Sequence, residues 1–296
     1  MAFREELATN AAYLDLITRL LQRLRVADPM AGLWEAADLQ WWWRRDRSSD
    51  DIGQLFWLDE LGDPVAAIVF TDWDRSWACD LIHAPDDSEV LFTALWDRAL
   101  DRMAELKLPT VEVAARDDDT RMLDALAAAG FTPEGEVGTE TWLDATHKPQ
   151  VAPLPPGYRL HSRAETPNRP HHMIARNGER VAERLGECSL YDPDLDLFVE
   201  ASDGEVAAYA LFWADPVTRV GLIEPMRTES PHQRLGLARH LLTEGVHRLV
   251  AHDCDRLKVF YQNDNPAAQR LYLGAGFVPT FTTRIYVRQR APKRRA

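Results

Sequence analysis

One apolar pattern occurs twice in the chain, about half a chain length apart, and this repeat limits the possible folds more than any other feature. Residues 55–71 and 197–213 each consist of an apolar run, a turn with a glycine and a second apolar run. The turn glycines, Gly62 and Gly204, lie 142 positions apart, and two Ala-Gly-Phe triplets further on lie 146 positions apart. The spacing is too long for a solenoid array, whose repeats are about 20–50 residues long. It predicts two copies of one domain.

Hydrophobic periodicity indicates that each copy alternates strands with helices. Apolar residues at helical spacing predict helices, and short apolar runs between turn signals predict strands. The first copy reads helix, three strands, helix, strand, helix and strand over residues 7–25, 54–58, 65–70, 77–82, 88–106, 110–114, 120–129 and 139–143. This order favours a mixed α/β fold with a partly parallel sheet.

A proline-rich stretch separates the two copies. Four prolines and Gly157 fall between Asp144 and Tyr158, among few apolar side chains. Such composition is typical of a linker. We therefore expect a first domain at residues 1–144, a linker at 145–157 and a second domain at 158–296.

Composition narrows the classes of function. The chain has 296 residues, of which 46% are hydrophobic and 27% charged, as in a globular protein with a sizeable core. The net charge of −13 argues against nucleic acid as a partner and suits a cationic small substrate. No apolar run approaches the roughly 20 residues of a membrane span. The three scattered cysteines form neither a disulfide framework nor a metal-ligand spacing, so we expect a cytoplasmic protein without a metal.

The two copies differ between their third strand and the next helix. Residues 83–89 of the first copy have no glycine, and carry two aspartates that would repel a phosphate. Residues 224–238 of the second copy end in Gln-Arg-Leu-Gly-Leu-Ala. A glycine at position 236 lets main-chain N–H groups approach an anion at a helix N-terminus. Tyr272 of the second copy aligns with Leu126 of the first. The pattern predicts that the second copy carries the site and that the first is degenerate.

Two motifs of the second copy resemble those of the GNAT superfamily of acyl-CoA-dependent N-acetyltransferases. The phosphate-loop motif Gln/Arg-x-x-Gly-x-Gly/Ala matches residues 233–238. The later motif Asn-x-x-Ala-x-x-Leu-Tyr-x-x-x-Gly-Phe matches residues 265–277, with Ala-Ala at the alanine position. The resemblance covers residues 158–287 and extends to the first copy only through the repeat. It implies an α/β fold of two tandem GNAT-like acyl-CoA acyltransferase domains.

The resemblance also implies acetyl-CoA as co-substrate. The loop and the strand before it are expected to bind the pyrophosphate and pantetheine, and Asn265 is expected near the CoA arm while capping its own helix. The residues assigned to binding are Met226, Arg227, Thr228, Gln233, Arg234, Leu235, Gly236, Leu237, Ala238, Arg239, Asn265 and Ala268.

The reaction that the resemblance implies is attack of an amine on the acetyl thioester, which needs a base and an acid. Glu224 is the candidate base, acting through a water, and a main-chain N–H near Met226 is the candidate for polarising the carbonyl. Tyr272 is the candidate acid for the leaving sulfur. The alternatives are that Glu224 pairs with Arg227 or another surface cation, and that Tyr272 is a core tyrosine with a satisfied hydroxyl.

We expect a structural role for three other groups of residues. His171 and His172 precede a helix expected from Met173 to Leu185, in the region where GNAT proteins bind the acceptor, but two adjacent histidines cannot both point at one site from a helix. The acidic residues at 192–196 are expected in solvent. Trp41–Trp43 are expected to pack their segment onto the domain rather than stack on a ligand.

The resulting hypothesis is an acetyl-CoA-dependent N-acetyltransferase that acts on a primary amine, in the monomer or a homodimer. One alternative is a protein or peptide N-acetyltransferase, and another is a non-catalytic CoA-binding regulatory protein. We expect neither nucleic acid nor membrane as a partner.

Overall fold

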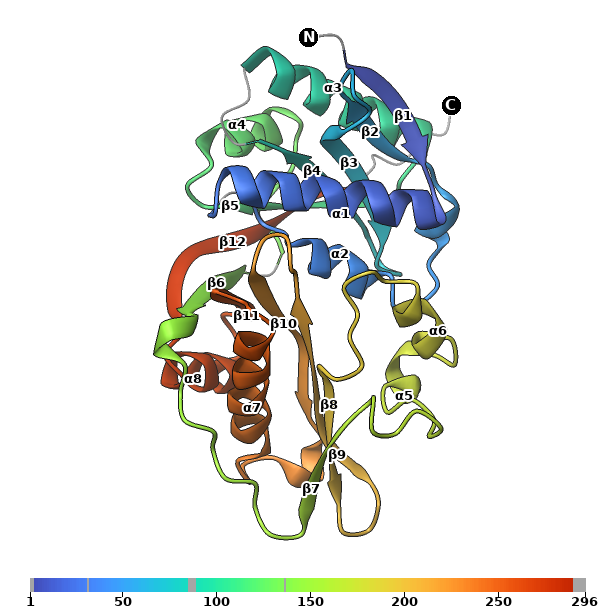
Figure 1. Ribbon diagram of the computed structural model, residues 1–296. Coiled ribbons are helices and arrows are strands. Elements are labelled where there is room, and N and C mark those ends of the chain that lie inside the picture. Colours follow the sequence, from blue (N-terminus) through green and yellow to red (C-terminus); the bar gives the residue numbers. More distant parts are fainter. Residues whose placement is uncertain (1–2, 31, 85–88, 136, 290–296) are drawn as a thin grey trace, which may run out of the picture. The chain divides into compact units, whose positions relative to one another are not determined.

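The structure is a computed structural model, described for residues 3–30, 32–84, 89–135 and 137–289 (Figure 1). The chain forms two compact units. Unit 1 contains the chain up to Trp34, Asp46–Gly138 and the chain from Phe281 onward, and unit 2 contains Glu35–Arg45 and Thr139–Thr280. Each unit includes a segment from the other half of the chain. The boundaries of the units therefore differ from those of the two sequence halves.

Unit 1 is a sheet with helices, and its elements match the predicted order up to the helix at 120–129, but the strand predicted at 139–143 belongs to unit 2. Neighbouring strands lie in the order β1-β2-β3-β4-β5-β12, and only β4 and β5 are parallel among the pairs with a described register. Short β1 is an addition to the prediction. The elements are β1 (Arg4–Ala8), α1 (Asn10–Ala27), the 3-10 turn η1 (Ser48–Asp51), β2 (Gln54–Leu58), β3 (Pro64–Asp72), β4 (Trp77–His83), α3 (Glu89–Glu105), β5 (Thr110–Arg116), α4 (Thr120–Ala128) and β12 (Val278–Gln289).

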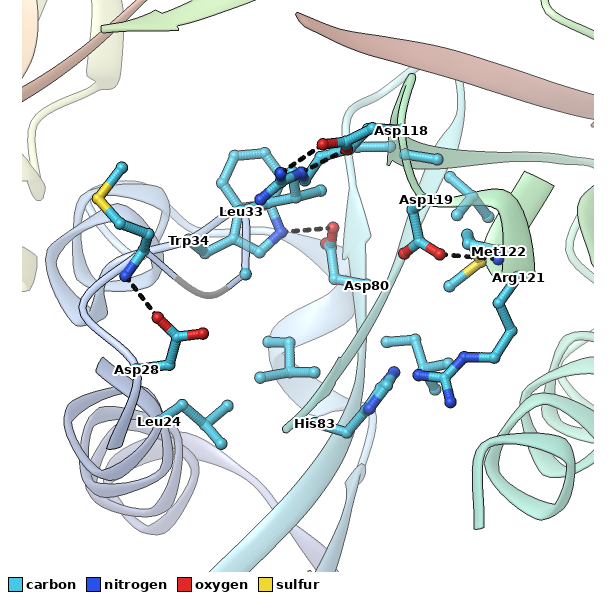
Figure 2. Close-up of a pocket in the computed structure, with 18 of the residues that line it drawn as sticks. Leu24, Asp28, Leu33, Trp34, Asp80, His83, Asp118, Asp119, Arg121 and Met122 are labelled. Atoms are coloured by element: carbon cyan, nitrogen blue, oxygen red, sulfur yellow. Dashed lines mark hydrogen bonds and ion pairs between the residues drawn. The ribbon is translucent and has the colours of Figure 1, made fainter. Parts of the chain in front are cut away.

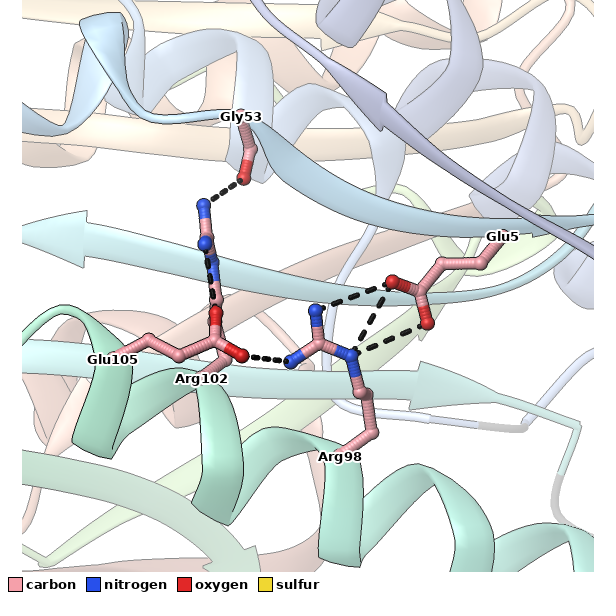
Figure 3. A network of polar contacts seen from close by, with 5 residues as sticks. All are labelled: Glu5, Gly53, Arg98, Arg102 and Glu105. Carbon is pink, nitrogen blue, oxygen red and sulfur yellow. Dashed lines mark hydrogen bonds and ion pairs between the residues drawn. The ribbon is translucent and has the colours of Figure 1, made fainter.

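Salt bridges hold α3 to the sheet edge of unit 1 (Figure 3). Arg98 contacts the carboxylate of Glu5 on β1 at 3.2 Å and Glu105 at 3.2 Å. Arg102 binds the same Glu105 at 2.9 Å and donates to the carbonyl of Gly53 at 3.3 Å. Because Arg98 and Arg102 are partly buried, this network fixes α3 better than isolated surface pairs do.

Unit 2 repeats the plan of a sheet with helices. Its strands lie in the order β6-β11-β10-β9-β8-β7, with β10 and β11 parallel and the pairs from β10 to β7 antiparallel. Its elements are α2 (Ala36–Trp42), β6 (Val137–Asp144), η2 (Ala145–His147), β7 (Tyr158–Ser162), α5 (Ile174–Asn177), α6 (Val181–Gly186), β8 (Asp196–Ala201), β9 (Val206–Ala214), β10 (Val220–Thr228), η3 (Ser230–His232), α7 (Leu237–Ala251), β11 (Arg256–Gln262) and α8 (Pro266–Gly274).

Each unit has its own apolar core. In unit 1 the core includes Ile68, Leu95 and Leu126, all essentially inaccessible to solvent. In unit 2, α7 packs on β9 and β10 and buries Leu241 and Val246 (Figure 1). The proline-rich residues 145–157 belong to unit 2 and bind α7, since Thr243 accepts from Ala152 N at 2.9 Å.

In each unit, the strands have an equivalent pairing register just before the two parallel strands separate. Trp77 of β4 is paired with Asp72 of β3 and Val111 of β5. Gly221 of β10 is paired in the same way with Ala214 of β9 and Leu257 of β11. In both units the parallel pairing ends one residue later. Three residues beyond each of these positions lies a carboxylate, Asp80 in unit 1 and Glu224 in unit 2.

Candidate functional site

A β-bulge opens β10 at Glu224. The pairing with β9 shifts register between Ile223 and Met226, so that Glu224 and Pro225 leave the ladder. Pro225 has no N–H to donate, which is consistent with the break in pairing at this point. The Glu224–Pro225 peptide bond is cis, and Trp213 Nε1 donates to the Glu224 carbonyl at 2.8 Å. The bulge aims the Glu224 side chain away from the regular ladder.

The loop after β10 has the backbone of an anion cradle. Arg234 and Gly236 both have positive φ, 64° and 86°, and Gly236 directly precedes the fifteen-residue helix α7. Alternation of right- and left-handed residues turns successive N–H groups toward one side, and the helix N-terminus adds partial positive charge. Gln233, Arg234, Leu235 and Gly236 are exposed, whereas Leu237 is buried and anchors the loop. The predicted loop residues thus lie together, open to a ligand.

Two side chains of α2, Asp38 and Trp41, form hydrogen bonds with Glu224. The sequence did not predict this environment. Burial raises the pKa of Glu224, and the hydrogen bond with Asp38, the charges of Arg44 and Lys258, and a hydrogen bond with Trp41 oppose the rise. Burial also raises the pKa of Asp38 well above its usual range, and the neighbouring Glu224 raises it further. Within this hydrogen-bonded pair, burial favours the protonated form of Asp38 more strongly than that of Glu224.

A buried ion cluster fixes α2 within unit 2. Lys258 of β11 lies 3.1 Å from Glu35, the residue before α2, and 2.9 Å from Glu140 of β6. The main-chain N–H of Glu35 in turn donates to Asp38 at 2.7 Å. Because all these groups are buried, the charges hold the segment in one position.

The three tryptophans pack α2 onto unit 2, as predicted. Trp41, Trp42 and Trp43 are at most 9% exposed. Trp43 Nε1 donates to Glu187 at 2.6 Å, and the guanidinium of Arg184 lies 3.4 Å from the centre of a Trp43 ring.

Tyr272 of α8 lies in the core of unit 2, beside the rings of Tyr261 and Phe277. Burial raises the pKa of its phenol, and the negative charge of Glu224 raises it further. A phenol in this state is protonated at neutral pH and can donate. At the start of α8, the side chain of Asn265 accepts from Ala268 N at 3.1 Å, which is the capping role expected from the sequence.

The alternative in which Glu224 forms an ion pair with Arg227 does not agree with the structure. Its guanidinium binds Glu229 at 3.0 Å, and Arg176 binds the same carboxylate at 3.0 Å. Glu224 instead interacts with the α2 residues and Lys258.

His171, His172 and Asp196 form a buried trio in unit 2. The Nε2 atoms of the two histidines lie 3.0 and 3.1 Å from the two Asp196 oxygens, and Tyr191 donates to Asp196 at 2.8 Å. Burial opposes ionisation of Asp196, but the bonds from His171 and His172 hold its pKa well below the usual range. The expectation that Asp196 lies in solvent was wrong. One ligand atom from each of the three residues lies within 4.8 Å of the others, and His172 Nε2 and Asp196 Oδ1 have no hydrogen-bond partner among the described residues despite their 3.1 Å separation.

Two protein sequences are similar to parts of the chain. Mycothiol acetyltransferase from Beutenbergia cavernae is 30% identical over 164 residues, which cover 50% of this chain and 52% of that protein. Mycothiol acetyltransferase from Kineococcus radiotolerans is 37% identical over 87 residues, or 29% of this chain and 27% of that protein. The chain thus spans about half the length of the first relative and about a quarter of the second.

Solved structures share the fold. A tandem GNAT protein from the clavulanic acid biosynthesis pathway matches with a TM-score of 0.68 at 14% identity, over 99% of this chain and 100% of the other. A GCN5-related N-acetyltransferase from Sphaerobacter thermophilus matches with a TM-score of 0.63 at 17% identity, over 97% and 95%. Among the described residues, no helix is long and apolar enough to cross a membrane.

Family assignment rests on unit 2, where the bulge, the glycine loop and Tyr272 lie. Residues 154–277 match the acetyltransferase (GNAT) family, over nearly all of the region that carries both sequence motifs. The predicted resemblance and the mixed α/β fold are confirmed. The chain therefore contains a domain of the acetyltransferase (GNAT) family at residues 154–277.

Proposed function

We propose that unit 2 transfers the acetyl group of acetyl-CoA to a primary amine of a small cationic molecule. The observation that carries this proposal is Glu224 at the β10 bulge, hydrogen-bonded to Asp38 and directly before the loop that leads to Gly236. The two arrangements supply a base and an anion cradle on consecutive segments of chain.

In the proposed reaction the amine must first lose a proton. Glu224 accepts it through a water, and the neutral nitrogen attacks the thioester carbon. A main-chain N–H near Met226 stabilises the charge that develops on the carbonyl oxygen. The carbon–sulfur bond then breaks, and Tyr272 donates its phenolic proton to the leaving thiolate. Met226, Arg227 and Thr228 of β10, residues 233–239 of the loop, and Asn265 with Ala268 would bind acetyl-CoA.

The acceptor class is supported by charge. The chain carries a net charge of −13, which attracts a cationic amine. An acceptor from mycothiol synthesis is the first to test, because both similar proteins carry the name mycothiol acetyltransferase. Peptide N-termini are the second candidate class of acceptor. The alternative function is that of a non-catalytic protein that binds CoA.

Free-thiol release with a panel of amines tests the proposal. The panel contains aminosugar thiols, aminoglycosides, polyamines and peptide N-termini, each at saturating acetyl-CoA. We expect turnover with a small amine, with an acid limb of the kcat/KM profile above the ordinary glutamate pKa of about 4.5, because burial raises the pKa of Glu224. Acetyl-CoA binding without turnover on any amine would support the non-catalytic alternative.

We further propose that the two sequence copies, 1–144 and 158–296, are related in origin and that only unit 2 is catalytic. Unit 2 takes residues 35–45 and 139–144 from the first copy, and unit 1 takes residues 281–289 from the second. A cytoplasmic monomer or homodimer is part of the same proposal.

A further inference from the structure

Unit 1 contains a cavity of about 550 Å³ on the face of its sheet next to α1 (Figure 2). Its walls come from the C-terminal part of α1, from β4 and β5 where these strands part, and from the start of α4. Leu24, Leu33 and Ile82 give it apolar walls. The volume lies within the range of small-molecule pockets, about 300–1,000 Å³.

Asp80 is the polar group that this cavity leaves unsatisfied. The residue is 5% exposed and lines the cavity from β4. Its Oδ1 accepts from Trp34 Nε1 at 3.0 Å, as Figure 2 shows, but its Oδ2 has no hydrogen-bond partner among the described residues. Burial raises the pKa of Asp80 to about 7, against the effect of the Trp34 hydrogen bond. A buried carboxylate oxygen without a partner is costly and is usually explained by a bound group.

The other carboxylates of the cavity already have partners. Asp28 accepts from Met30 N at 2.9 Å, and Asp119 accepts from Met122 N at 3.0 Å. Asp118 forms a two-point bond with Arg116, at 2.8 and 2.7 Å. Asp28, Asp118 and Asp119 are also exposed to water, whereas the unpaired oxygen of Asp80 is buried in the wall of the cavity.

The cations near the cavity are also engaged. Arg25 donates to the Pro29 carbonyl at 2.8 Å, and the Arg121 guanidinium lies 4.4 Å from the centre of the Phe92 ring. His83 Nδ1 lies 2.7 Å from the Ala84 carbonyl. None of these contacts involves Asp80, and Asp80 has no ion pair among the described residues.

We infer that the cavity of unit 1 binds a small primary ammonium compound, with Asp80 as its counter-ion. An ammonium group donates to the free Oδ2 and neutralises the carboxylate, while the apolar walls hold the carbon skeleton. Asp80 stands at the position that Glu224 occupies in unit 2, but β4 pairs with β3 without a bulge, from Trp77 to His83. The site binds an amine and does not acetylate it. This inference does not depend on turnover in unit 2.

Titration of the full chain with 2-phenylethylamine tests the inference, with 2-phenylethanol as the neutral probe of similar shape. The indole N–H resonance of Trp34, assigned through its loss in Trp34→Phe, reports on the cavity itself. We expect saturable shifts of this resonance with the amine and at least about tenfold weaker binding of the alcohol.

Two variants locate the binding. Asp80→Asn keeps an acceptor for Trp34 but removes the charge, and we expect at least about tenfold weaker amine binding. Glu224→Gln, which alters the proposed site of unit 2, should leave the Trp34 response unchanged. Ala114→Leu, which fills part of the cavity from β5, should weaken both probes.

Several results would overturn the inference. These are equal affinities of the amine and the alcohol, unchanged binding in Asp80→Asn, loss of the Trp34 response in Glu224→Gln, and absence of saturation at about 10 mM amine. Failure of acetyl transfer in unit 2 would leave the Trp34 titration unaffected, so the two proposals fail separately.

Discussion

Units 1 and 2 place a buried carboxylate at the same register position but surround it differently. Asp80 and Glu224 each follow the point where two parallel strands part. Only β10 has a bulge there, and only unit 2 continues into a loop with glycine at its helix N-terminus. The fold thus supplies the position of the carboxylate, whereas catalysis in our proposal depends on local departures from the regular sheet.

The neighbours of the two carboxylates also differ. At Glu224, the hydrogen bond with Asp38 and the charges of Arg44 and Lys258 oppose the effect of burial on the pKa. Asp80 has one hydrogen bond, from Trp34. Neighbouring cations and hydrogen-bond donors favour the ionised form of a buried carboxyl group. A buried carboxyl group that lacks them is stabilised in its ionised form by binding a cation. Four predictions test this comparison.

The largest expected effect is on turnover. Glu224→Gln should lower kcat by about 10³-fold, because a positioned general base contributes about 10²–10⁴-fold. The dissociation constant of acetyl-CoA, measured by calorimetry, should stay unchanged. Asp80→Asn is the matched control and should change kcat by less than about twofold. Equal losses in the two variants would show that unit 1 takes part in catalysis.

The second effect is on stability. Lys258→Met leaves Glu35 and Glu140 buried without their cation, and should lower the free energy of unfolding of unit 2 by about 3–5 kcal/mol. Glu112 occupies the matching register position on β5 and is half-buried. Glu112→Met should cost less than about 0.5 kcal/mol. Hydrogen exchange of β11 and β5 amides measures both, and a small effect of Lys258→Met would contradict the role of the ion cluster.

The third effect separates acid catalysis from packing. Tyr272→Phe keeps the ring in the core but removes the phenolic proton, and should lower kcat by about 10²-fold. Tyr261→Phe changes the ring that stacks on Tyr272 at 6.4 Å and should lower kcat by less than about threefold. If both variants lose activity equally, the hydroxyl of Tyr272 has a structural role.

The smallest effect concerns pH. The pKa of Asp80 is raised to about 7 in the folded state, so folded protein holds a proton that the unfolded chain releases near pH 4. Stability therefore falls as pH rises between these values, by up to about 1.4 kcal/mol per pH unit. Asp80→Asn should remove about 1 kcal/mol of the fall between pH 5.5 and 6.5, read from hydrogen exchange of β4 amides. An unchanged pH dependence would show that Asp80 already has a counter-ion.

Much of the fold could be predicted because it depends on local pattern. The helix predicted at 88–106 is α3 at Glu89–Glu105, and the strand predicted at 110–114 is β5 at Thr110–Arg116. The helix expected from Met173 to Leu185 is instead divided into α5 and α6 at Gly178, whose φ of 88° ends the first. The apolar residues keep helical spacing across Gly178, so hydrophobic periodicity did not predict the division into two helices.

The polar environment of Glu224 could not be predicted, because its members are far apart in sequence. Asp38 and Arg44 were counted with the first copy, and Lys258 sits in a strand whose other residues are mostly apolar. A lysine in a buried strand is a signal that it has carboxylate partners, but it does not say which. Asp80 shows the same limit, since a single aspartate in a strand does not reveal the cavity beside it.

The sequence by itself determined the repeat, the order of helices and strands, and the glycine loop with its family motif. These features depend on spacing along the chain and on the backbone freedom of residues such as Gly236. The tertiary structure alone decided that residues 35–45 join unit 2, that Asp38 lies beside Glu224, and that Asp80 lines a cavity. The protonation state of a carboxylate depends on burial and on charges brought near by folding, and neither quantity exists before the chain is folded.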